Sequence, residues 1–307
     1  MSHNLTMLKL YFSNRKYWKL SDNTNNKVSS KSGKFFLNLK DRLEDNHYDI
    51  FDVNGLPVRM KNNKKVYNYT TICSYALANW QLYLETGIED YTIQLFKTIE
   101  FLKENNESTD YGGIVFPLYN KLSSMNQGEA LSVLARGYEL TKNEDYISLA
   151  KKIILPYDVF VEDYGVKGRF KNMDNVFWYE EYAEIPHIHV LNGMIYSLVG
   201  LWEINQIKPE LINAKQLFDK GILYLEQVLP LYDTGKWSWY WLGEKKPNYM
   251  ASVMYHNLHV CQLKYLNSIT GSIIIKKYAD EFEEYSNRTI NRILSGFYLL
   301  KGKIGMK

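Results

Sequence analysis

The chain has 307 residues, of which 46% are hydrophobic and 23% charged, as in ordinary globular proteins of one large domain or two smaller ones. Its net charge of +3 is too small to predict nucleic-acid binding, and no apolar run approaches the 18 or so residues of a membrane-spanning helix. The unusual feature is the aromatic content, with 26 tyrosines and 7 tryptophans. Aromatic side chains pack cores, and they also offer flat faces that suit a sugar ring.

The first 20 residues contain no uninterrupted apolar segment and no small-residue cleavage site, so the sequence predicts a cytoplasmic protein without a signal peptide. Cys73 and Cys261 both lie in apolar helical patterns. We expect two buried thiols rather than a disulfide or a metal site.

Residues 1–66 differ in composition from the rest and are rich in Asn, Lys, Ser and Asp. A turn is predicted at Asp52–Gly55, and the alternation over Lys34–Leu39 is compatible with a hairpin or an extended arm. We therefore predict an irregular N-terminal extension over residues 1–66, with room for one hairpin.

From residue 67 onward the pattern is helical, and it repeats. The segment Leu82–Tyr91 recurs as Tyr138–Tyr146, with the two final tyrosines 55 positions apart, and weaker copies follow at Trp202–Leu211 and Leu266–Ile273. Each copy ends one amphipathic helix and begins another, so the repeated unit is a helical hairpin. We predict an all-α fold over residues 67–307, an α/α toroid built as an incomplete barrel of helical hairpins.

Three long links between the hairpins cover residues 105–125, 156–190 and 229–251. Because they join successive units on the same side, we expect them to converge at one end of the ring, where connecting segments carry function.

The most polar of these links precedes Asn192-Gly193, which begins a helix. Three carboxylates, two tyrosines and two histidines lie within a dozen positions there. Such a loop, running into a helix N-terminus, suits the binding of an anionic substrate and the transfer of a proton. The alternative is that the loop only caps the helix and covers an edge of the core.

Five segments occur in an order and spacing that are together informative: Ser124–Ala130, Trp178–Tyr182, Val190–Leu198, Leu229–Gly235 and Tyr255-His256. The set resembles the C-terminal domain of D-glucuronyl C5-epimerase, over roughly residues 67–290. The resemblance implies an α/α barrel, no cofactor, and conversion of D-glucuronate to L-iduronate within a polysaccharide or oligosaccharide. It also implies an anionic glycan as partner, without nucleic acid; a homodimer is left open.

By the same resemblance, Tyr255, Tyr240 and Glu181 are the catalytic residues. Epimerisation at C5 needs a base on one face, an acid on the other, and donors that stabilise charge on the neighbouring carboxylate. We place Tyr255 and Glu181 on opposite faces, with Tyr240 orienting the carboxylate or sharing the proton. Tyr240 lies in a tryptophan-rich run and could instead be a stacking platform, and Tyr255 could be an aromatic residue at a helix start.

Substrate contacts are expected from Trp178, Tyr182, His187, His189, Asn192, Asn126, Gln127, Arg169, Trp239 and His256. His187 and His189 could instead bind a metal, but no third ligand follows at a helpful spacing, so we predict sugar contacts and no metal site. Asn126 and Gln127 could instead cap their helix.

The family pattern has an arginine three residues after the tyrosine matched by Tyr240, and this chain has Gly243 there. Without that arginine, either uronate recognition is lost or another cation holds the substrate carboxylate, with Arg169, Lys236 and Arg136 as candidates.

Other activities on the same scaffold stay open. A lyase would use the same proton abstraction and then expel the C4 oxygen, with Tyr255 and His256. A hydrolase needs two carboxylates, such as Glu181 with Asp174 or Glu184. A silent glycan-binding module would keep the tryptophans and lose proton transfer.

Overall fold

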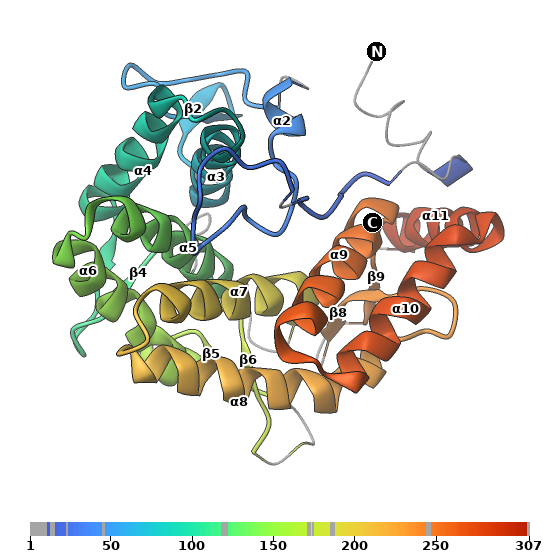
Figure 1. Cartoon of the computed structure of the whole chain (residues 1–307). Helices are drawn as coiled ribbons and strands as arrows, with labels where there is room; N and C mark the ends of the chain where they lie inside the picture. The colour runs from blue at the N-terminus through green and yellow to red at the C-terminus, as the bar shows by residue number, and fades with distance from the viewer. Residues whose placement is uncertain are drawn as a thin grey trace.

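A computed structural model of the chain describes residues 11–305 except 13–15, 23, 45–46, 118–121, 171–172, 174, 185–187 and 244–246. Its main helices form consecutive hairpins: α3 (Tyr69–Thr86) with α4 (Ile93–Glu104), α5 (Ser124–Thr141) with α6 (Glu144–Ile154), α7 (Leu191–Ile207) with α8 (Ile212–Val228), and α9 (Val253–Thr270) with α10 (Ile273–Asn287). Helix α11 (Thr289–Gly305) follows. Figure 1 shows α3, α5, α7 and α9 as an inner row, with α4, α6, α8 and α10 outside it. The predicted α/α toroid of helical hairpins is confirmed.

The sequence repeat corresponds to one helix-ending structure used three times. At the ends of α3, α5 and α9, a threonine hydroxyl donates to the carbonyl four residues earlier and accepts the backbone N–H two residues later; these threonines are Thr86, Thr141 and Thr270. The next residue caps the helix in the left-handed conformation, as Gly87, Lys142 and Gly271. The same turn thus reverses the chain between an inner and an outer helix.

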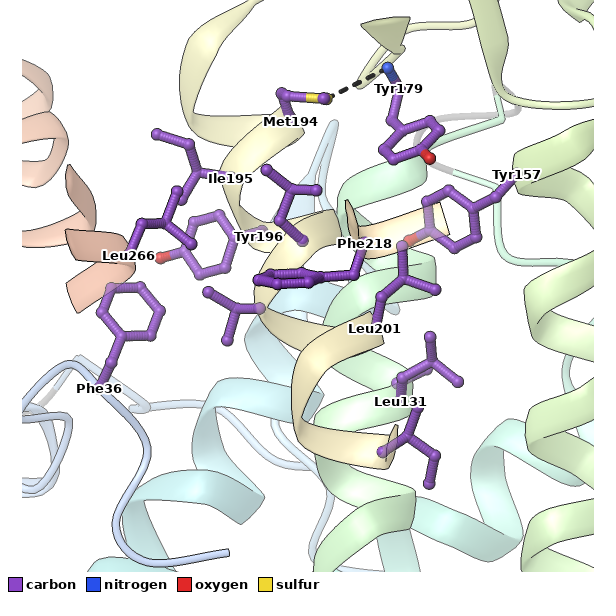
Figure 2. Packing of buried hydrophobic residues seen from close by; sticks show 14 of the residues in the cluster. Phe36, Leu131, Tyr157, Tyr179, Met194, Ile195, Tyr196, Leu201, Phe218 and Leu266 are labelled. Atoms are coloured by element: carbon purple, nitrogen blue, oxygen red, sulfur yellow. Dashed lines mark hydrogen bonds between the residues drawn. The ribbon is translucent and has the colours of Figure 1, made fainter. Parts of the chain in front are cut away.

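The core lies between the two rows of helices, and Figure 2 shows it around α7, where Leu201 lies close to Phe218 of α8 and Leu131 of α5. Helices α5 and α7 approach closely because two glycines face each other. A Cβ on Gly128 would lie 2.4 Å from the Tyr196 carbonyl oxygen, and a Cβ on Gly200 would lie 2.1 Å from the Gly128 oxygen. Backbone packs against backbone here, so neither position accepts a side chain.

Replacing Gly200 with Ala is therefore expected to destabilise the fold, by about 1–3 kcal/mol or more for an overpacked core. The direction of the stability change is informative, because replacing Gly with Ala in a solvent-exposed helix interior stabilises a protein by about 1 kcal/mol. Urea unfolding of Gly200→Ala, beside the exposed control Lys220→Ala on α8, measures the difference. A gain in stability would show that α5 and α7 can move apart without cost.

Short strands lie in the links and in the N-terminal region. They form four small antiparallel sheets: β1 (Arg59–Lys61) with β2 (Lys64–Val66), β3 (Glu107–Ser108) with β4 (Ile114–Val115), β5 (Lys167–Arg169) with β6 (Phe177–Tyr179), and β7 (Ile188–Val190) with β8 (Trp239–Gly243) and β9 (Tyr249–Met250). The pairing of β7 with β8 joins the second long link to the third. The described residues also contain the 3-10 helices η1 (Glu89–Thr92), η2 (Leu155–Asp158), η3 (Val161–Asp163) and η4 (Leu229–Tyr232) and the short α-helix α2 (Asp41–Glu44).

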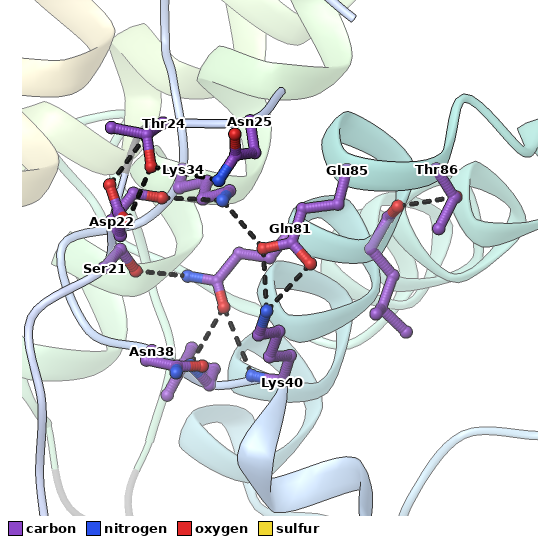
Figure 3. Close-up of polar contacts among 12 residues, drawn as sticks. Ser21, Asp22, Thr24, Asn25, Lys34, Asn38, Lys40, Gln81, Glu85 and Thr86 are labelled. Atoms are coloured by element: carbon purple, nitrogen blue, oxygen red, sulfur yellow. Dashed lines mark hydrogen bonds and ion pairs between the residues drawn. The ribbon is translucent and has the colours of Figure 1, made fainter. Parts of the chain in front are cut away.

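The N-terminal segment is fixed to the inner face of α3 by one buried glutamine. Gln81 accepts from the backbone N–H of Leu39 at 2.9 Å and donates to the carbonyl oxygens of Phe35 and Leu37 at 3.0 and 2.6 Å. Figure 3 shows its further bonds to the Lys40 backbone N–H and the Ser21 hydroxyl. Residues 34–39 run alongside residues 19–21, with Leu37 opposite Leu20 in an antiparallel bridge, and β1–β2 forms a separate hairpin.

The same segment also reaches the other end of the inner row. The Trp18 backbone N–H donates to Asn257 Oδ1 of α9 at 2.5 Å, while Glu85 of α3 pairs with Lys34 at 2.7 Å and with Lys40 at 2.8 Å (Figure 3). The N-terminal segment therefore bridges α9 and α3, the two ends of the incomplete ring (Figure 1).

Two smaller expectations are also met. Cys73 and Cys261 are buried free thiols. Within the described ranges, we find no helix with the length and apolar character that crossing a membrane requires.

Candidate active site

A cavity of about 200 Å³ lies where the inner helices meet the N-terminal segment. The helices contribute Thr70, Thr71, Ser74, Met125, Glu129, Asn192, Tyr196, Met254, Tyr255 and Leu258. The N-terminal region contributes Tyr17, Trp18, Phe35, Leu39, Arg42, His47, Tyr48 and Arg59, and the second long link contributes Glu181. Two of the predicted catalytic residues, Glu181 and Tyr255, thus line one cavity.

Glu181 lies in the turn after β6. The Ser124 backbone N–H donates to the Glu180 carbonyl oxygen, and the Ala183 N–H donates to the Leu122 oxygen, so the turn is held against the start of α5. Gly193 leaves space for the side chain, because a Cβ there would lie 2.5 Å from Glu181 Cβ. Asn192 and Gly193 together position this carboxylate, Asn192 by a hydrogen bond and Gly193 by leaving room for the Glu181 side chain.

The Glu181 carboxyl group is only 4% exposed. Asn192 Nδ2 donates to Oε2 at 3.1 Å. Burial raises the pKa of Glu181 to about 7, although the neighbouring Tyr182 and Asn192 act to lower it. A carboxyl group with such a pKa can take up or release a proton near neutral pH.

Tyr255 lies in the first turn of α9, whose N-cap residue Ser252 accepts the Tyr255 backbone N–H at 3.3 Å. Its ring centroid is 4.4 Å from that of Tyr240 on β8. Burial raises the pKa of Tyr240 well above its ordinary value, and the neighbouring Glu181, Tyr255 and Tyr182 add to the increase. Tyr240 is 8% exposed and stands behind Tyr255, outside the set of described residues that line the cavity.

The cations of the cavity come from the N-terminal region. The Arg42 guanidinium lies 4.0 Å from the ring centroid of Tyr17 and 4.1 Å from that of Trp18, and Nη1 donates to the Tyr17 hydroxyl. Arg59 donates to Thr71 Oγ1 at 3.1 Å and lies 3.1 Å from His47 Nε2. Sequence reasoning missed both arginines.

Arg42 is 7% exposed, and among the described residues it forms no ion pair with a carboxylate. Buried arginines are normally paired, so an unpaired one beside a cavity indicates an anionic ligand.

A second carboxyl group, Glu129 of α5, lines the cavity and is 2% exposed. Burial raises its pKa well above the ordinary value, against a hydrogen bond with Thr70 and with the charge of Glu181 adding to the increase. Sequence reasoning quoted the motif that contains Glu129 without assigning it a role. The sequence spacing is consistent with this position. Glu129 follows Met125, another residue of the cavity lining, by four positions, so both face the same side of α5.

Three buried polar atoms around this cavity have no hydrogen-bond partner among the described protein groups: Arg42 Nη2, Glu129 Oε2 and Asn192 Oδ1. Buried polar atoms in native proteins are almost always hydrogen-bonded. Their grouping around one cavity favours a polar ligand there.

The other amides expected to bind sugar hydroxyls instead hold the fold. Gln127 is fully buried and bonds to backbone groups of Phe116, Ile114 and Ile153. Asn126 donates to the Phe116 carbonyl oxygen at 3.0 Å. Both fix the first long link to α5, and neither lines the cavity.

The predicted aromatic and histidine contacts on the second link are buried too. Trp178 is fully buried and stacks on Tyr232, with centroids 5.6 Å apart. His189 is 1% exposed; its Nδ1 lies 2.7 Å from Glu180 Oε1, and its ring stacks on Phe170. A sugar cannot reach either side chain, so we correct both to packing residues. His187 lies outside the described residues.

On the third link and α9, the residues beside Tyr255 also serve packing. His256 is fully buried, stacks on Trp237 and donates from Nε2 to the Phe282 carbonyl oxygen at 2.8 Å. Burial lowers its pKa to about 3, so the ring is neutral. Trp239 is half-buried and packs against Tyr298 of α11, away from the cavity.

None of the three cations proposed from the sequence lines the cavity. Arg169 is exposed and pairs with Glu162 at 3.0 Å. Arg136 is fully buried and forms an ion pair with Glu203 at 2.7 Å, inside the core between α5 and α7. Lys236 is exposed on the turn before β8. Among the described residues, the arginines that line the cavity are Arg42 and Arg59.

Comparison with known proteins identifies the family of the chain. Residues 120–284 match the family described as D-glucuronyl C5-epimerase C-terminus. The chain belongs to this family. A D-glucuronyl C5-epimerase of Caenorhabditis elegans is 35% identical over 179 residues, which cover 53% of this chain and 28% of the nematode protein. An uncharacterised protein of Methanocaldococcus jannaschii is 31% identical over 175 residues, 55% of each chain. This C5-epimerase family chain thus matches only part of the length of either relative.

Solved structures support the same fold for this member of the C5-epimerase family. An α-1,6-mannanase, GH76A from Salegentibacter sp. HEL1_6, superposes with a TM-score of 0.55 at 12% identity, covering 80% of this chain and 69% of the mannanase. A possible GH105 family member from Salmonella enterica gives 0.51 at 12% identity, covering 80% and 79%. At such identities the likeness concerns the fold alone.

Proposed function

We propose that this chain is a uronate C5-epimerase that interconverts D-glucuronate and L-iduronate in a polysaccharide or oligosaccharide. The observation that carries the proposal is the cavity in which Glu181 and Tyr255 stand together with Arg42 and Arg59. It offers two groups able to exchange a proton and two cations for the substrate carboxylate. The C. elegans relative bears the name of this activity.

In the proposed reaction, the Glu181 carboxylate removes the proton from C5 on one face of the sugar. The pair of electrons moves toward the neighbouring carboxylate, where an arginine stabilises the growing negative charge. The Tyr255 hydroxyl then delivers its proton to the opposite face of C5. In the reverse direction, the two residues exchange roles.

Arg42 is the proposed main partner of the substrate carboxylate, because it is buried and forms no ion pair with a described carboxylate. Arg59 is exposed at the same cavity and adds positive charge. Asn192 and Glu129 each present a buried oxygen that no described protein group contacts by a hydrogen bond, and we assign them to sugar hydroxyls. Tyr182, predicted from the sequence as a substrate contact, is not among the described residues that line the cavity; it lies beside Glu181 and acts to lower the pKa of that group.

The pH dependence of kcat/KM is expected to reflect Glu181. Burial raises the pKa of this group to about 7, so below pH 7 it becomes protonated and can no longer act as a base while Tyr255 keeps its own proton. kcat/KM should therefore fall tenfold per pH unit well below pH 7. The same fall in kcat/KM at low pH is expected for both directions of the reaction. One direction uses the Glu181 carboxylate with the Tyr255 phenol and the other uses the Glu181 acid with the Tyr255 phenolate, and these two forms carry the same number of protons. A limb near the ordinary pKa of glutamate, about 4.3, would contradict the assigned burial.

A second candidate is glycoside hydrolysis, because Glu181 and Glu129 are two carboxyl groups at one cavity. Of the partners considered for Glu181 from the sequence, Glu184 is exposed and outside the cavity lining, and Asp174 lies outside the described residues.

Product analysis separates these activities. A panel of glucuronate- and iduronate-containing glycans is incubated with the protein in D₂O. Epimerisation incorporates deuterium at C5 without new chain ends, hydrolysis releases reducing ends, and a lyase produces an alkene that absorbs in the ultraviolet. We expect deuterium at C5 alone; new reducing ends or ultraviolet absorbance would replace the proposal with the corresponding cleavage.

A further inference from the structure

Three fully buried side chains form a hydrogen-bonded set at the start of α9. Ser238, the residue before β8, places its Oγ 2.8 Å from His256 Nδ1 and 2.9 Å from His259 Nδ1. Its backbone N–H also donates to His256 Nδ1, at 3.2 Å. We call Ser238, His256 and His259 the Ser238 set. It joins the third long link to the helix that carries Tyr255.

The hydrogen bonds of this set have one direction. Burial keeps both rings neutral, because it lowers the pKa of His256 to about 3 and the pKa of His259 well below its ordinary value. His256 Nε2 lies 2.8 Å from the Phe282 carbonyl oxygen, so Nε2 carries the hydrogen and Nδ1 accepts. The Ser238 hydroxyl then donates to His256 Nδ1, and its oxygen accepts the Nδ1–H of His259. The set thus connects the third link, α9 and α10.

The Ser238 set adjoins both tyrosines of the site. Tyr240 follows Ser238 by two residues, and Tyr255 directly precedes His256. The ring of Tyr240 lies 4.4 Å from that of Tyr255, between centroids, and is nearly parallel to the His259 ring at 6.5 Å. His259 follows Tyr255 by four positions and therefore lies on the same side of α9. Side-chain hydrogen bonds thus hold the strand of Tyr240 to the helix of Tyr255.

Tyr255 needs such support because of its place in the helix. It lies in the first turn of α9, which begins at Val253. The first turn of a helix is weakly held, since its first four N–H groups have no partner within the helix. A group that transfers a proton must lie at hydrogen-bond distance from the reacting atom. A small displacement of this turn would therefore carry the Tyr255 hydroxyl out of range of C5.

We propose that the Ser238 set positions Tyr255 for proton transfer at C5; this role rests on the proposed epimerase function. No member of the set is among the described residues that line the cavity, so its members are positioning residues that act through Tyr255. Glu181 is held separately, by the hydrogen bond from Asn192 of α7. Loosening the Ser238 set should therefore weaken proton transfer at one face of C5 and leave the other face intact.

The two faces of C5 can be followed separately in D₂O. After Glu181 removes the proton from one epimer, delivery of a proton by Tyr255 to the other face inverts the carbon. Return of deuterium from the Glu181 side, after exchange with solvent, labels the same epimer without inverting it. The ratio of labelling without inversion to inversion therefore measures the placement of Tyr255, and it does not depend on the amount of folded enzyme.

Ser238→Ala removes the hydroxyl that links the two histidines. With the epimer whose C5 proton Glu181 removes, we expect inversion to fall roughly 10- to 100-fold, the cost of misplacing a reacting group by about 1 Å. Labelling without inversion should stay within about threefold of wild type, because Glu181 keeps its place.

His259→Phe tests the same link without weakening the fold. It keeps a flat ring beside Tyr240, removes the hydrogen bond to Ser238, and takes away a buried Nε2 that has no hydrogen-bond partner among the described protein groups. Urea unfolding should show stability no lower than that of wild type. The ratio of labelling without inversion to inversion should rise, as in Ser238→Ala.

Ser272→Ala is the matched control for a lost hydroxyl. Ser272 caps α10 by accepting the Ile275 backbone N–H at 3.2 Å, and it lies just past the opposite end of α9 from Tyr255. Its loss should lower stability and leave the ratio at the wild-type value. The inference is overturned if Ser238→Ala and His259→Phe also keep the wild-type ratio, because the set would then only stabilise the fold. Wild-type protein without any exchange at C5 would instead refute the proposed function.

Discussion

Tyr255→Phe is expected to abolish conversion between the two epimers while substrate binding and folding persist. The change removes only the hydroxyl, so the ring contact with Tyr240 remains and the lost interaction is the one made in proton transfer. General acid–base catalysis by one positioned group contributes about 10²–10⁴-fold, and we expect a loss of that size in kcat. Nuclear magnetic resonance of the C5 protons in both epimers measures the conversion.

Tyr265→Phe is the control for this variant, because it removes a hydroxyl from the same helix α9 at a position outside the cavity lining. It should leave kcat unchanged. Conversion by Tyr255→Phe at the wild-type rate would exclude Tyr255 from proton transfer and leave only its packing role.

Arg42→Met is expected to separate activity from stability. The loss of a charged partner for the substrate carboxylate should cost about 2–5 kcal/mol of transition-state binding, which lowers kcat/KM by roughly 30- to 5,000-fold. Stability should not fall, because Arg42 is buried and has no carboxylate partner in the part of the chain that the structure describes. Methionine keeps packing on Tyr17 and Trp18 while removing that buried charge. Kinetics and urea unfolding of the same preparation measure both effects.

Arg169→Met gives the comparison, since this arginine is exposed and paired with Glu162, away from the cavity. Its kcat/KM should match wild type. If Arg169→Met loses activity and Arg42→Met keeps it, the carboxylate is held by the second link, as the sequence first suggested, and the N-terminal segment has no part in recognition.

The fold and part of the site could be predicted from sequence because their signals are local. A threonine followed by a residue in the left-handed conformation ends α3, α5 and α9 in the same way, so the repeat of helical hairpins can be recognised in the amino-acid sequence. Asn192-Gly193 is likewise a local seat for Glu181.

The cations could not be predicted, because their positions depend on contacts between distant parts of the chain. Arg42 lies at the cavity because hydrogen bonds from the N-terminal segment to Gln81 of α3 and Asn257 of α9 hold this segment between the two ends of the ring. That segment has no motif or helical period to reveal a binding role. The burial of individual side chains could not be predicted from the sequence either. Trp178 and His256 have side chains typical of sugar-binding sites, yet both are packed in the protein interior.

The central claim, that Glu181 and Tyr255 serve opposite faces of one C5 atom, is tested most directly by deuterium exchange with each epimer separately. Glucuronate- and iduronate-containing glycans are incubated in D₂O with wild type, Tyr255→Phe and Glu181→Gln. Wild type should place deuterium at C5 while interconverting both epimers. Each variant should exchange the hydrogen of one epimer without inverting it, and the two variants should exchange opposite epimers. Exchange of the same epimer by both variants, or no deuterium incorporated by wild type into any glycan, would contradict the account.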